Sequence, residues 1–328
     1  MKALVQDEYG SSEVLRVEEV PMPTIKPNEV LIRVKAAGID AGAVHLMTGT
    51  PLLVRYMGVG VNRPKNRTIG MDVAGLIEQV GDKVATLKVG DEVFGVGIST
   101  FAEFAVADPK KLALKPANVT FGQAAATPVS GATALQAIRS AGTLGPDSRV
   151  LVLGASGGVG HFAVQLAKAT GAHVTGVCSG VKRDFVLSLG ADEALDYRTT
   201  DVTDGSHKYN LIIDTGGNRT LAQLRNALTR KGRLIIIGGE GAGGPFLSGL
   251  DRLMRAGLLS MVVPQKLGGF VSTIGAKDLE ELRALLESKT ITARINLSYA
   301  LSKMPQAMAQ FEKHQALGKI VMVSFDKK

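Results

Sequence analysis

A glycine-rich turn, Gly154-Ala-Ser-Gly-Gly-Val-Gly160, contains the residues of this sequence that are best suited to bind a ligand. An apolar run over 149–153 precedes the turn, and the apolar residues of 159–168 are spaced as in a buried helix. Backbone amides at a helix N-terminus that no side chain obstructs bind pyrophosphate. We therefore expect the phosphates of a dinucleotide to bind at this turn. The expected contacts are Ala155, Ser156, Gly157, Gly158 and Val159.

Further strand candidates follow the turn at the distances that βαβ units require. They cover residues 173–177, 193–197, 210–215 and 233–239. The turn matches the fingerprint G-x-G-x-x-G with Ala155 in place of the first glycine. A tight turn without a ligand is the alternative, but the repeated β-α pattern favours a doubly wound parallel Rossmann sheet. Thr215, Gly238 and Gly239 lie at the ends of two of these strands, where such sheets bind cofactors.

The end of the second strand indicates which dinucleotide binds. An acidic residue at this place would bind the ribose hydroxyls of NAD, but the sequence continues Cys178-Ser-Gly-Val-Lys-Arg183. The Ser179 hydroxyl and the cations of Lys182 and Arg183 suit the 2′-phosphate of NADP. The alternative is that the two cations belong only to the solvated first turn of a helix. We expect NADP (NADPH) rather than NAD.

The whole chain has the composition of a globular enzyme. Of its 328 residues, 45% are hydrophobic and 21% are charged, which argues against disorder and favours two domains. The net charge of +8 comes from scattered lysines and arginines, so we expect no nucleic-acid partner. No apolar run is long enough to cross a bilayer and no signal peptide is recognisable. We therefore expect no membrane partner and a cytoplasmic location.

The N-terminal third has a different pattern. Short runs of strand-forming residues alternate with turns rich in Gly, Pro and charge, which predicts a small, mostly antiparallel, barrel-like domain. These runs cover residues 2–6, 13–18, 29–36, 72–80, 92–96 and 102–107. A helix-rich link over 121–143 leads into the Rossmann domain, whose last strand we expect at 269–274.

Several motifs occur along the chain in a fixed order. They include Lys35-Ala-Ala-Gly-Ile39, Gly70-Met-Asp-Val-Ala-Gly75, Val89-Gly-Asp-Glu-Val-Phe-Gly95, Gly131-Ala-Thr-Ala134 and the glycine turn. Together they resemble the medium-chain dehydrogenase/reductase superfamily, in particular its zinc-free, quinone-oxidoreductase-like branch. The resemblance implies an α/β protein with a GroES-like β-barrel catalytic domain over 1–121. It further implies a Rossmann NADP-binding domain over 122–275 and a return to the catalytic domain over 276–328.

The resemblance also implies roles for residues that no local pattern identifies. Family members hold the residues that match Thr133, Tyr197 and Lys319 close to the cofactor, although a threonine such as Thr133 is as often a cap or core residue. A homodimer is implied as well. In it the last Rossmann strand, about 270–274, pairs with its symmetry mate and removes an exposed sheet edge.

Two departures from the wider superfamily concern its catalytic zinc. In the alcohol dehydrogenases of the superfamily, a cysteine follows the first Ala-Ala-Gly stretch and a histidine comes from a Gly-His-Glu motif. Here no cysteine lies near Asp40, and Met71 occupies the histidine place. A thioether does not replace imidazole on Zn²⁺, and the single cysteine, Cys178, belongs to the cofactor domain. We expect no metal site.

Three side chains are candidates for a catalytic role. Asp40 stands where quinone-reductase relatives carry the asparagine of an Asn-Pro-x-Asp pattern, but Ala43 replaces the later aspartate, and a turn-forming role is the alternative. His45 could donate a proton, or pack as a structural histidine. Tyr56 lies in an insertion, 51–66, that we expect to form a lobe over the substrate site or to pack on the barrel.

These features predict an NADPH-dependent oxidoreductase that reduces small quinones or other enones by hydride transfer without a metal. A zinc-free NADP-dependent alcohol dehydrogenase or carbonyl reductase is the alternative, and it would need a protein proton donor beside the carbonyl oxygen. The alternative from another functional class is a non-catalytic protein that binds NADPH or nucleic acid.

Overall fold

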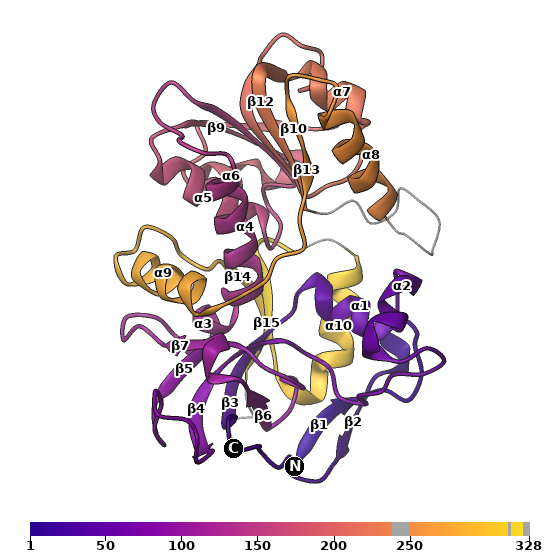
Figure 1. The fold of residues 1–328 in the computed structure, drawn as a ribbon, viewed down its shortest axis with the longest axis vertical. Coiled ribbons are helices and arrows are strands. Elements are labelled where there is room, and N and C mark those ends of the chain that lie inside the picture. Colours follow the sequence, from indigo (N-terminus) through magenta and orange to yellow (C-terminus); the bar gives the residue numbers. More distant parts are fainter. Residues whose placement is uncertain (238–248, 314–315, 324–328) are drawn as a thin grey trace. The chain divides into compact units, whose positions relative to one another are not determined.

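The computed structural model describes residues 1–237, 249–313 and 316–323 (Figure 1). The chain divides into two compact units. The first consists of Met1–Ala132 together with Thr273–Lys328, and the second of Thr133–Ser272. From the sequence we expected these boundaries at 121/122 and 275/276.

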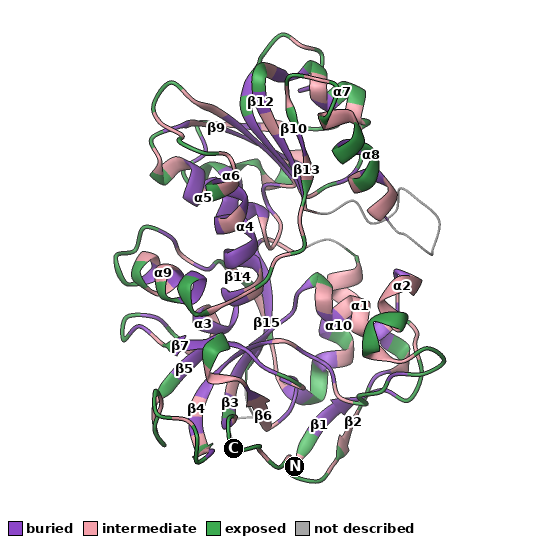
Figure 2. Cartoon of the chain, in the orientation of Figure 1, coloured by how far each residue is buried: buried purple, intermediate pink, exposed green. Residues whose placement is uncertain are grey.

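The second unit is built on a six-stranded sheet in the order β10-β9-β8-β11-β12-β13. All neighbouring strands run parallel, and the order reverses between β8 and β11, which is the Rossmann topology. The strands are β8 (Arg149–Leu153), β9 (His173–Cys178), β10 (Glu193–Asp196), β11 (Tyr209–Asp214), β12 (Leu228–Ile236) and β13 (Lys266–Gly269). Figure 2 shows that the strands of this sheet are mostly buried, as their apolar sequences require.

Helices connect these strands and cover the sheet. Helices α5 and α6 contact β9, whereas α7 contacts β12 and α8 contacts β13 (Figure 1). Their bounds are α5 (Gly160–Ala169), α6 (Arg183–Ser188), α7 (Leu221–Asn226) and α8 (Leu250–Ser260), with a short 3₁₀ turn η4 (Gly180–Lys182) ahead of α6. The βα order predicted from the sequence is therefore confirmed.

The last strand of this sheet differs from our expectation. We predicted it at 269–274, but β13 covers Lys266–Gly269 and the following residues form no strand. Leu267 is buried in the core beside α8, and Ser260 Oγ accepts a hydrogen bond from its backbone N–H at 3.0 Å. Val271, by contrast, is 84% exposed. Burial of Leu267 therefore outweighed the higher strand propensity of the β-branched residues that follow.

The first unit is built on a seven-stranded sheet. Its order is β14-β15-β3-β4-β5-β7, with β6 paired to β3. Neighbouring strands are antiparallel except β14 and β15, which confirms a mostly antiparallel domain. The strands are β3 (Val30–Gly38), β4 (Asp72–Val80), β5 (Glu92–Val96), β6 (Phe104–Ala107), β7 (Leu112–Leu114), β14 (Ile295–Tyr299) and β15 (Lys319–Val323).

A separate two-stranded sheet precedes it, formed by β1 (Lys2–Val5) and β2 (Arg16–Glu19). We expected one strand over 13–18, but the chain first makes a 3₁₀ turn, η1 (Ser12–Val14). The Ser11 hydroxyl accepts a hydrogen bond from Glu13 N at 3.5 Å at the start of this turn. This local side-chain bond competes with strand pairing, so the strand begins only at Arg16.

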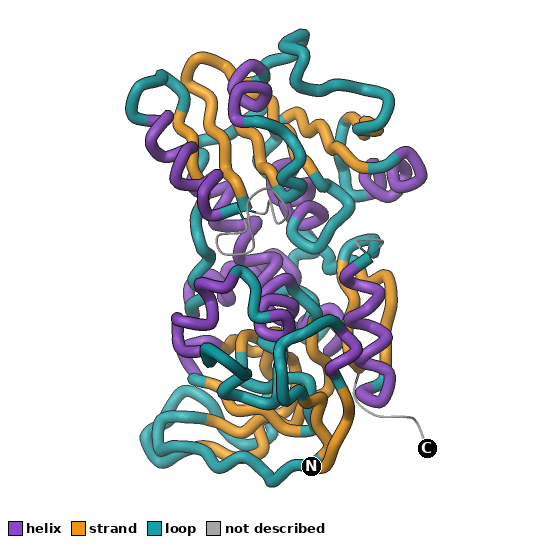
Figure 3. The backbone as a smooth tube through the Cα atoms, turned by 90° about the vertical axis from the view of Figure 1, so that its right-hand side faces the viewer, coloured by secondary structure: helices purple, strands orange, loops and turns teal. Residues whose placement is uncertain are grey.

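The remaining helices of the described residues lie in the first unit or start there. They are α1 (Ala41–Thr48), α2 (Leu52–Val54), α3 (Phe121–Ala125), α4 (Pro128–Ser140), α9 (Ala276–Glu287) and α10 (Met304–Glu312), with the π-helical segment η2 (Arg55–Val59) and the 3₁₀ turns η3 (Pro109–Lys111) and η5 (Leu301–Lys303). Helix α4 begins in the first unit and continues into the second. Figure 3 shows the strands of each unit grouped together with helices around them.

Within the described part of the chain, no helix is both long and apolar enough to cross a membrane.

Candidate active site

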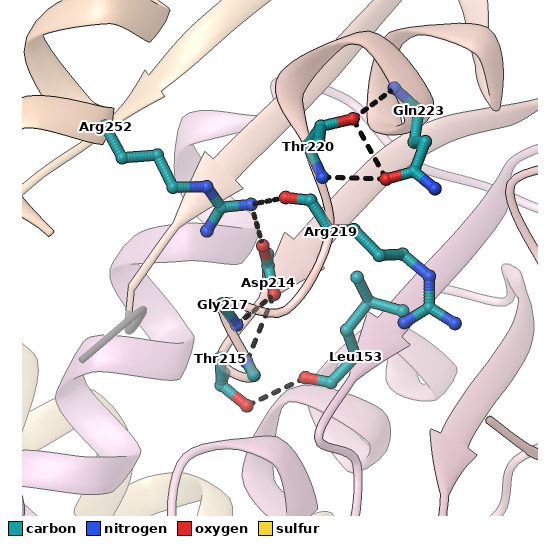
Figure 4. Close-up of polar contacts among 9 residues, drawn as sticks. Leu153, Asp214, Thr215, Gly217, Arg219, Thr220, Gln223 and Arg252 are labelled. Atoms are coloured by element: carbon teal, nitrogen blue, oxygen red, sulfur yellow. Dashed lines mark hydrogen bonds and ion pairs between the residues drawn. The ribbon is translucent and has the colours of Figure 1, made fainter. Parts of the chain in front are cut away.

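The glycine turn joins β8 to α5 in the second unit. Gly154 has a φ of +75°, which favours glycine, and a Cβ there would lie 2.3 Å from Thr215 Oγ1. Thr215 in turn donates from Oγ1 to the Leu153 carbonyl at 2.7 Å (Figure 4). The turn therefore packs directly against the loop that follows β11.

The two glycines of the fingerprint, Gly157 and Gly160, have different surroundings from Gly154. A Cβ on Gly160 would lie 2.1 Å from the carbonyl oxygen of Gly154, so α5 approaches the turn too closely for any side chain. A Cβ on Gly157 would meet only that same oxygen, at 3.3 Å. The backbone at Gly157 is thus open on its outer side, ahead of the N-terminus of α5. This arrangement fits the pyrophosphate of a dinucleotide.

A buried ion pair holds the loop after β11. Asp214 and Arg252 are 0% and 7% exposed, and Arg252 Nη2 lies 2.6 Å from Asp214 Oδ2. Asp214 Oδ1 also accepts hydrogen bonds from Gly216 N and Gly217 N at 3.1 and 3.0 Å. Arg252 donates to the Arg219 carbonyl at 2.8 Å, just before α7 (Figure 4). No local sequence pattern predicts this pair, because 38 positions separate its two members.

The α7 helix is anchored beside this pair. Thr220 and Gln223 form a capping box at its start, in which the Thr220 hydroxyl accepts from Gln223 N at 3.2 Å and Thr220 N donates to Gln223 Oε1 at 2.9 Å (Figure 4). Such reciprocal bonds satisfy two backbone donors of the first helical turn. The loop between β11 and α7 is consequently fixed at both ends.

The residues expected to bind the adenosine part of the cofactor lie at the ends of β9 and β10. Tyr197 N donates to the Cys178 carbonyl at 3.2 Å, which brings Tyr197 next to Ser179. Arg183 Nε donates to the Ala194 carbonyl at 2.7 Å, and burial lowers the pKa of Lys182. The four predicted residues of this end, Ser179, Lys182, Arg183 and Tyr197, are therefore brought together.

Two neighbours of this group were not anticipated. The guanidinium of Arg198 lies 5.6 Å from the centre of the Tyr197 ring. Asp196 pairs with Cys178 in the sheet, and a Cβ on Gly180 would lie 2.6 Å from Asp196 Oδ2. A carboxylate is thus present beside the loop, contributed by the neighbouring strand and not by the end of β9 itself. Its position depends on strand register, which the local sequence does not reveal.

A second cluster of charge lies in the first unit. Lys319 is 1% exposed, and its Nζ lies 3.3 Å from Asp72 Oδ2 and 3.1 Å from Ser130 Oγ. Asp72 Oδ1 accepts from Val129 N at 2.9 Å, near the start of α4. Asp40, 3% exposed, caps α1 by accepting from Ala43 N at 3.0 Å. Lys319, expected near the cofactor, thus has its ammonium bound to Asp72 and Ser130.

Burial dominates the electrostatics of this cluster. Burial raises the pKa of Asp72 to about 7, although the Lys319 ammonium lowers it, and the Asp40 carboxyl raises it further. Burial likewise raises the pKa of Asp40, against the opposing effects of Lys319 and His45. Desolvation disfavours the charged form of a carboxyl, and a second carboxylate nearby has the same effect.

His45 and Tyr56 have different surroundings. His45 Nδ1 lies 2.5 Å from the Thr50 carbonyl, which can only accept, so Nδ1 carries the proton. In the neutral ring Nε2 is then an acceptor and could donate only from the imidazolium. Tyr56 is 66% exposed and lies in the lobe formed by residues 51–66. Two hydrogen bonds hold this lobe in place: the Tyr9 hydroxyl donates to the Gly60 carbonyl at 2.6 Å, and Arg55 Nε donates to the Gly49 carbonyl at 2.9 Å.

The remaining predicted positions are as follows. Thr133 is 6% exposed inside α4, in the second unit. Gly238 and Gly239 lie outside the described residues. Met71 occupies the place of the zinc-binding histidine. Its sulfur lies close to Gly42, since a Cβ added to Gly42 would lie 2.9 Å from Met71 Sδ. Among the residues described, no group of three or more His, Cys, Asp or Glu side chains could hold a metal ion.

Comparisons with known proteins agree with this architecture. The family described as alcohol dehydrogenase GroES-like domain matches residues 26–117, and the family described as zinc-binding dehydrogenase matches residues 189–322. A mitochondrial NAD(P)H oxidoreductase, RTN4IP1 of Bos taurus, is 33% identical over 98% of this chain and 89% of its own length. The chloroplast envelope quinone oxidoreductase homolog of Arabidopsis thaliana is 32% identical over 98% of both chains.

A solved structure gives the same result. The quinone oxidoreductase from Coxiella burnetii superposes with a TM-score of 0.86 at 25% identity, covering 98% of this chain and 99% of its own. The chain belongs to the medium-chain dehydrogenase/reductase superfamily, in its quinone-oxidoreductase-like branch.

Proposed function

We propose that this protein is an NADPH-dependent oxidoreductase that reduces quinones or other enones by hydride transfer without a metal. The observation that carries the proposal is the open backbone at Gly157 ahead of α5, in a Rossmann sheet of the right order. The printed names of the relatives, an NAD(P)H oxidoreductase and quinone oxidoreductases, support the same reaction class.

The chemistry requires little of the protein beyond positioning. When bound, NADPH supplies a hydride from its nicotinamide ring. The glycine turn and the loop held by Asp214 and Arg252 would fix the dinucleotide. Negative charge develops on a conjugated oxygen, which is better stabilised than a simple alkoxide, so hydrogen-bond donors suffice without a Lewis acid. Simple aldehydes lack this stabilisation.

A substrate panel tests the proposal. We expect benzoquinones and enones to be reduced at least roughly tenfold faster than unactivated aldehydes, because the conjugated oxygen lowers the barrier by more than about 1.4 kcal/mol. NADPH and NADH consumption would be followed with each substrate, before and after exhaustive chelation. Preference for aldehydes would favour the carbonyl-reductase alternative, and no turnover at all would favour a binding protein. Stoichiometric zinc whose removal abolishes activity would contradict the metal-free reaction.

Cofactor preference is tested at the ends of β9 and β10. Replacing Lys182 and Arg183 together by alanine is expected to weaken NADPH binding roughly tenfold or more and NADH binding little, because only NADPH carries the 2′-phosphate. Dissociation constants of both cofactors would be measured by titration. Lys168→Ala is the matched control, since Lys168 pairs with Asp192 at 2.6 Å elsewhere in the same unit. Equal losses for the two cofactors would show that these cations do not recognise the 2′-phosphate.

We propose a homodimer in which the partner subunit covers the edge of the Rossmann sheet. β13 is the last strand of the sheet order, and α8 contacts it. Apolar side chains on and just after α8 are exposed, including Met254 at 66%, Leu258 at 67% and Met261 at 81%. Exposed apolar surface beside the last strand of a sheet is typical of a subunit contact. A monomer in light scattering at micromolar concentration would contradict the dimer.

We also propose a cytoplasmic location, which rests on the sequence expectations given above. The names of relatives include mitochondrial and chloroplast envelope proteins, so the proposal needs a direct test. Fractionation of cells that express the native gene decides it. Recovery with an organelle or membrane fraction would reject the cytoplasmic assignment.

A further inference from the structure

His161 lies in the first turn of α5, directly behind the glycine turn of the second unit. It is 0% exposed, and its ring lies against that of Phe162 with the ring centres 4.0 Å apart. Ala163 and Val164 next to it are equally buried, so packing alone would favour another apolar side chain here. A buried imidazole is costly unless its nitrogens are hydrogen-bonded, and its partners therefore indicate its role.

The backbone and the ring of His161 donate to the same oxygen. His161 N donates to the Gly157 carbonyl at 3.0 Å, as in a helical turn. The ring nitrogen Nδ1 lies 3.1 Å from the same carbonyl oxygen. Because a carbonyl oxygen only accepts, Nδ1 carries the proton and donates it to this bond. The Gly157 oxygen thus accepts two hydrogen bonds from one residue.

These two bonds fix the peptide group that joins Gly157 to Gly158. In a trans peptide the C=O and the N–H point in opposite directions. Since the Gly157 oxygen is held toward α5, the Gly158 N–H points away from α5, and it has no hydrogen-bond partner among the described residues. Residues 157–159 are partly exposed, so a ligand can reach this donor. Two consecutive glycines would otherwise leave the peptide free to rotate.

We propose that His161 is a positioning residue for the cofactor, whose Nδ1–H bond to Gly157 keeps the Gly158 N–H aimed at a pyrophosphate oxygen. His161 is buried and acts only through this peptide. The bond also polarises the peptide, because a hydrogen bond at the carbonyl oxygen strengthens donation by the N–H of the same amide. The inference rests on the proposed function for the identity of the ligand.

His161→Thr and His161→Val test the bond with two side chains of nearly the same shape. Both variants lose the imidazole and its contact with Phe162, but only threonine retains a donor. In a helix the threonine hydroxyl can donate to the carbonyl four residues earlier, as Thr48 does to Val44 at 2.9 Å in α1. At position 161 that carbonyl belongs to Gly157.

Dissociation constants would be measured on the full-length variants by calorimetric titration with NADPH and with adenosine 2′-monophosphate, which has no pyrophosphate. His161→Val should weaken NADPH binding roughly tenfold, because the Gly158 N–H is no longer held toward a charged acceptor. His161→Thr should bind NADPH at least about threefold more tightly than His161→Val. Both variants should bind adenosine 2′-monophosphate within about twofold of the wild type, since that probe does not reach the Gly158 N–H.

Gln165→Met is the matched control. Gln165 Nε2 donates to the His161 carbonyl at 2.9 Å, which is the same kind of bond one turn further along α5. This variant should bind NADPH within about twofold of the wild type, because the bond lies away from the glycine turn. The proposal is overturned if His161→Val binds NADPH as tightly as the wild type. It is also overturned if His161→Thr and His161→Val are equally impaired, since lost packing would then explain both.

A measurement on the ligand-free wild type completes the test. Its nitrogen NMR spectrum at pH 7 should show that Nδ1 of His161 carries a proton, and an unprotonated Nδ1 would overturn the proposal even if a variant fails to fold. NADPH binding by the wild type with no difference between the variants would reject this inference alone. No NADPH binding by the wild type would reject the proposed function, and this inference with it.

Discussion

Lys319→Met is expected to lower the free energy of unfolding by about 3–5 kcal/mol at pH 8 and by less than half as much at pH 5. Lys319 is 1% exposed and Asp72 is 0% exposed, so the variant leaves a buried carboxylate without its counter-charge. Methionine keeps the length of the side chain, which limits the loss of packing. Urea denaturation at the two pH values measures both effects.

The pH dependence follows from the raised pKa of Asp72. Folding raises this pKa from 3.8 to about 7, so between these values the native state binds more protons than the unfolded state. A group of this kind stabilises the protein fully below 3.8, and the contribution is lost as the pH rises toward 7. Without Lys319, which lowers this pKa, protonation is the remaining way to remove the buried charge, and it costs more free energy at pH 8 than at pH 5.

Lys168→Met is the control for this prediction. Lys168 also pairs with an aspartate, Asp192, at 2.6 Å, but the two side chains are 40% and 30% exposed. A solvated pair of this kind contributes about 1 kcal/mol or less, so the control should show a small effect at both pH values. Equal destabilisation of Lys319→Met at pH 5 and pH 8 would show that lost packing, and not the buried charge, is responsible.

Local patterns predicted much of the fold. β4, β5 and β8 begin and end at the residues expected from the sequence, because each is an apolar run bounded by Gly, Pro or charged residues. Helix α5 was predicted to within one residue at each end from the spacing of its apolar side chains. The glycine turn between β8 and α5 was identifiable for the same reason, since its chemistry lies within one contiguous segment.

The charge cluster could not be predicted in the same way. Asp72 and Lys319 are 247 positions apart, and only the pairing of β15 with β3 and of β3 with β4 brings them together. Asp72 was visible in a family motif but had no assigned partner, and Lys319 was expected near the cofactor. The Asp214–Arg252 pair was not predicted for the same reason, because 38 positions separate its members.

Gly157→Ala is expected to weaken NADPH binding roughly 100-fold while changing the stability of the free protein by about 1 kcal/mol or less. The added methyl group would meet only the Gly154 carbonyl oxygen, at 3.3 Å, so the fold can accommodate it with a small shift. The methyl would stand on the outer side of the turn, where the backbone must approach the pyrophosphate, and each lost hydrogen bond to a charged group contributes about 1.5–3 kcal/mol.

Gly160→Ala is the matched comparison, because it adds the same methyl group three residues later and should have the opposite pattern. Its Cβ would lie 2.1 Å from the Gly154 carbonyl oxygen and 2.8 Å from Ala155 Cα, so the backbone of the turn or of α5 must move. Overpacking of this kind costs about 1–3 kcal/mol or more, so thermal unfolding without ligand should detect it. Calorimetric titration with NADPH and thermal unfolding of both variants would separate the two roles. If Gly157→Ala binds NADPH as tightly as the wild type, the pyrophosphate does not lie on this turn, and the cofactor site proposed for the second unit is wrong.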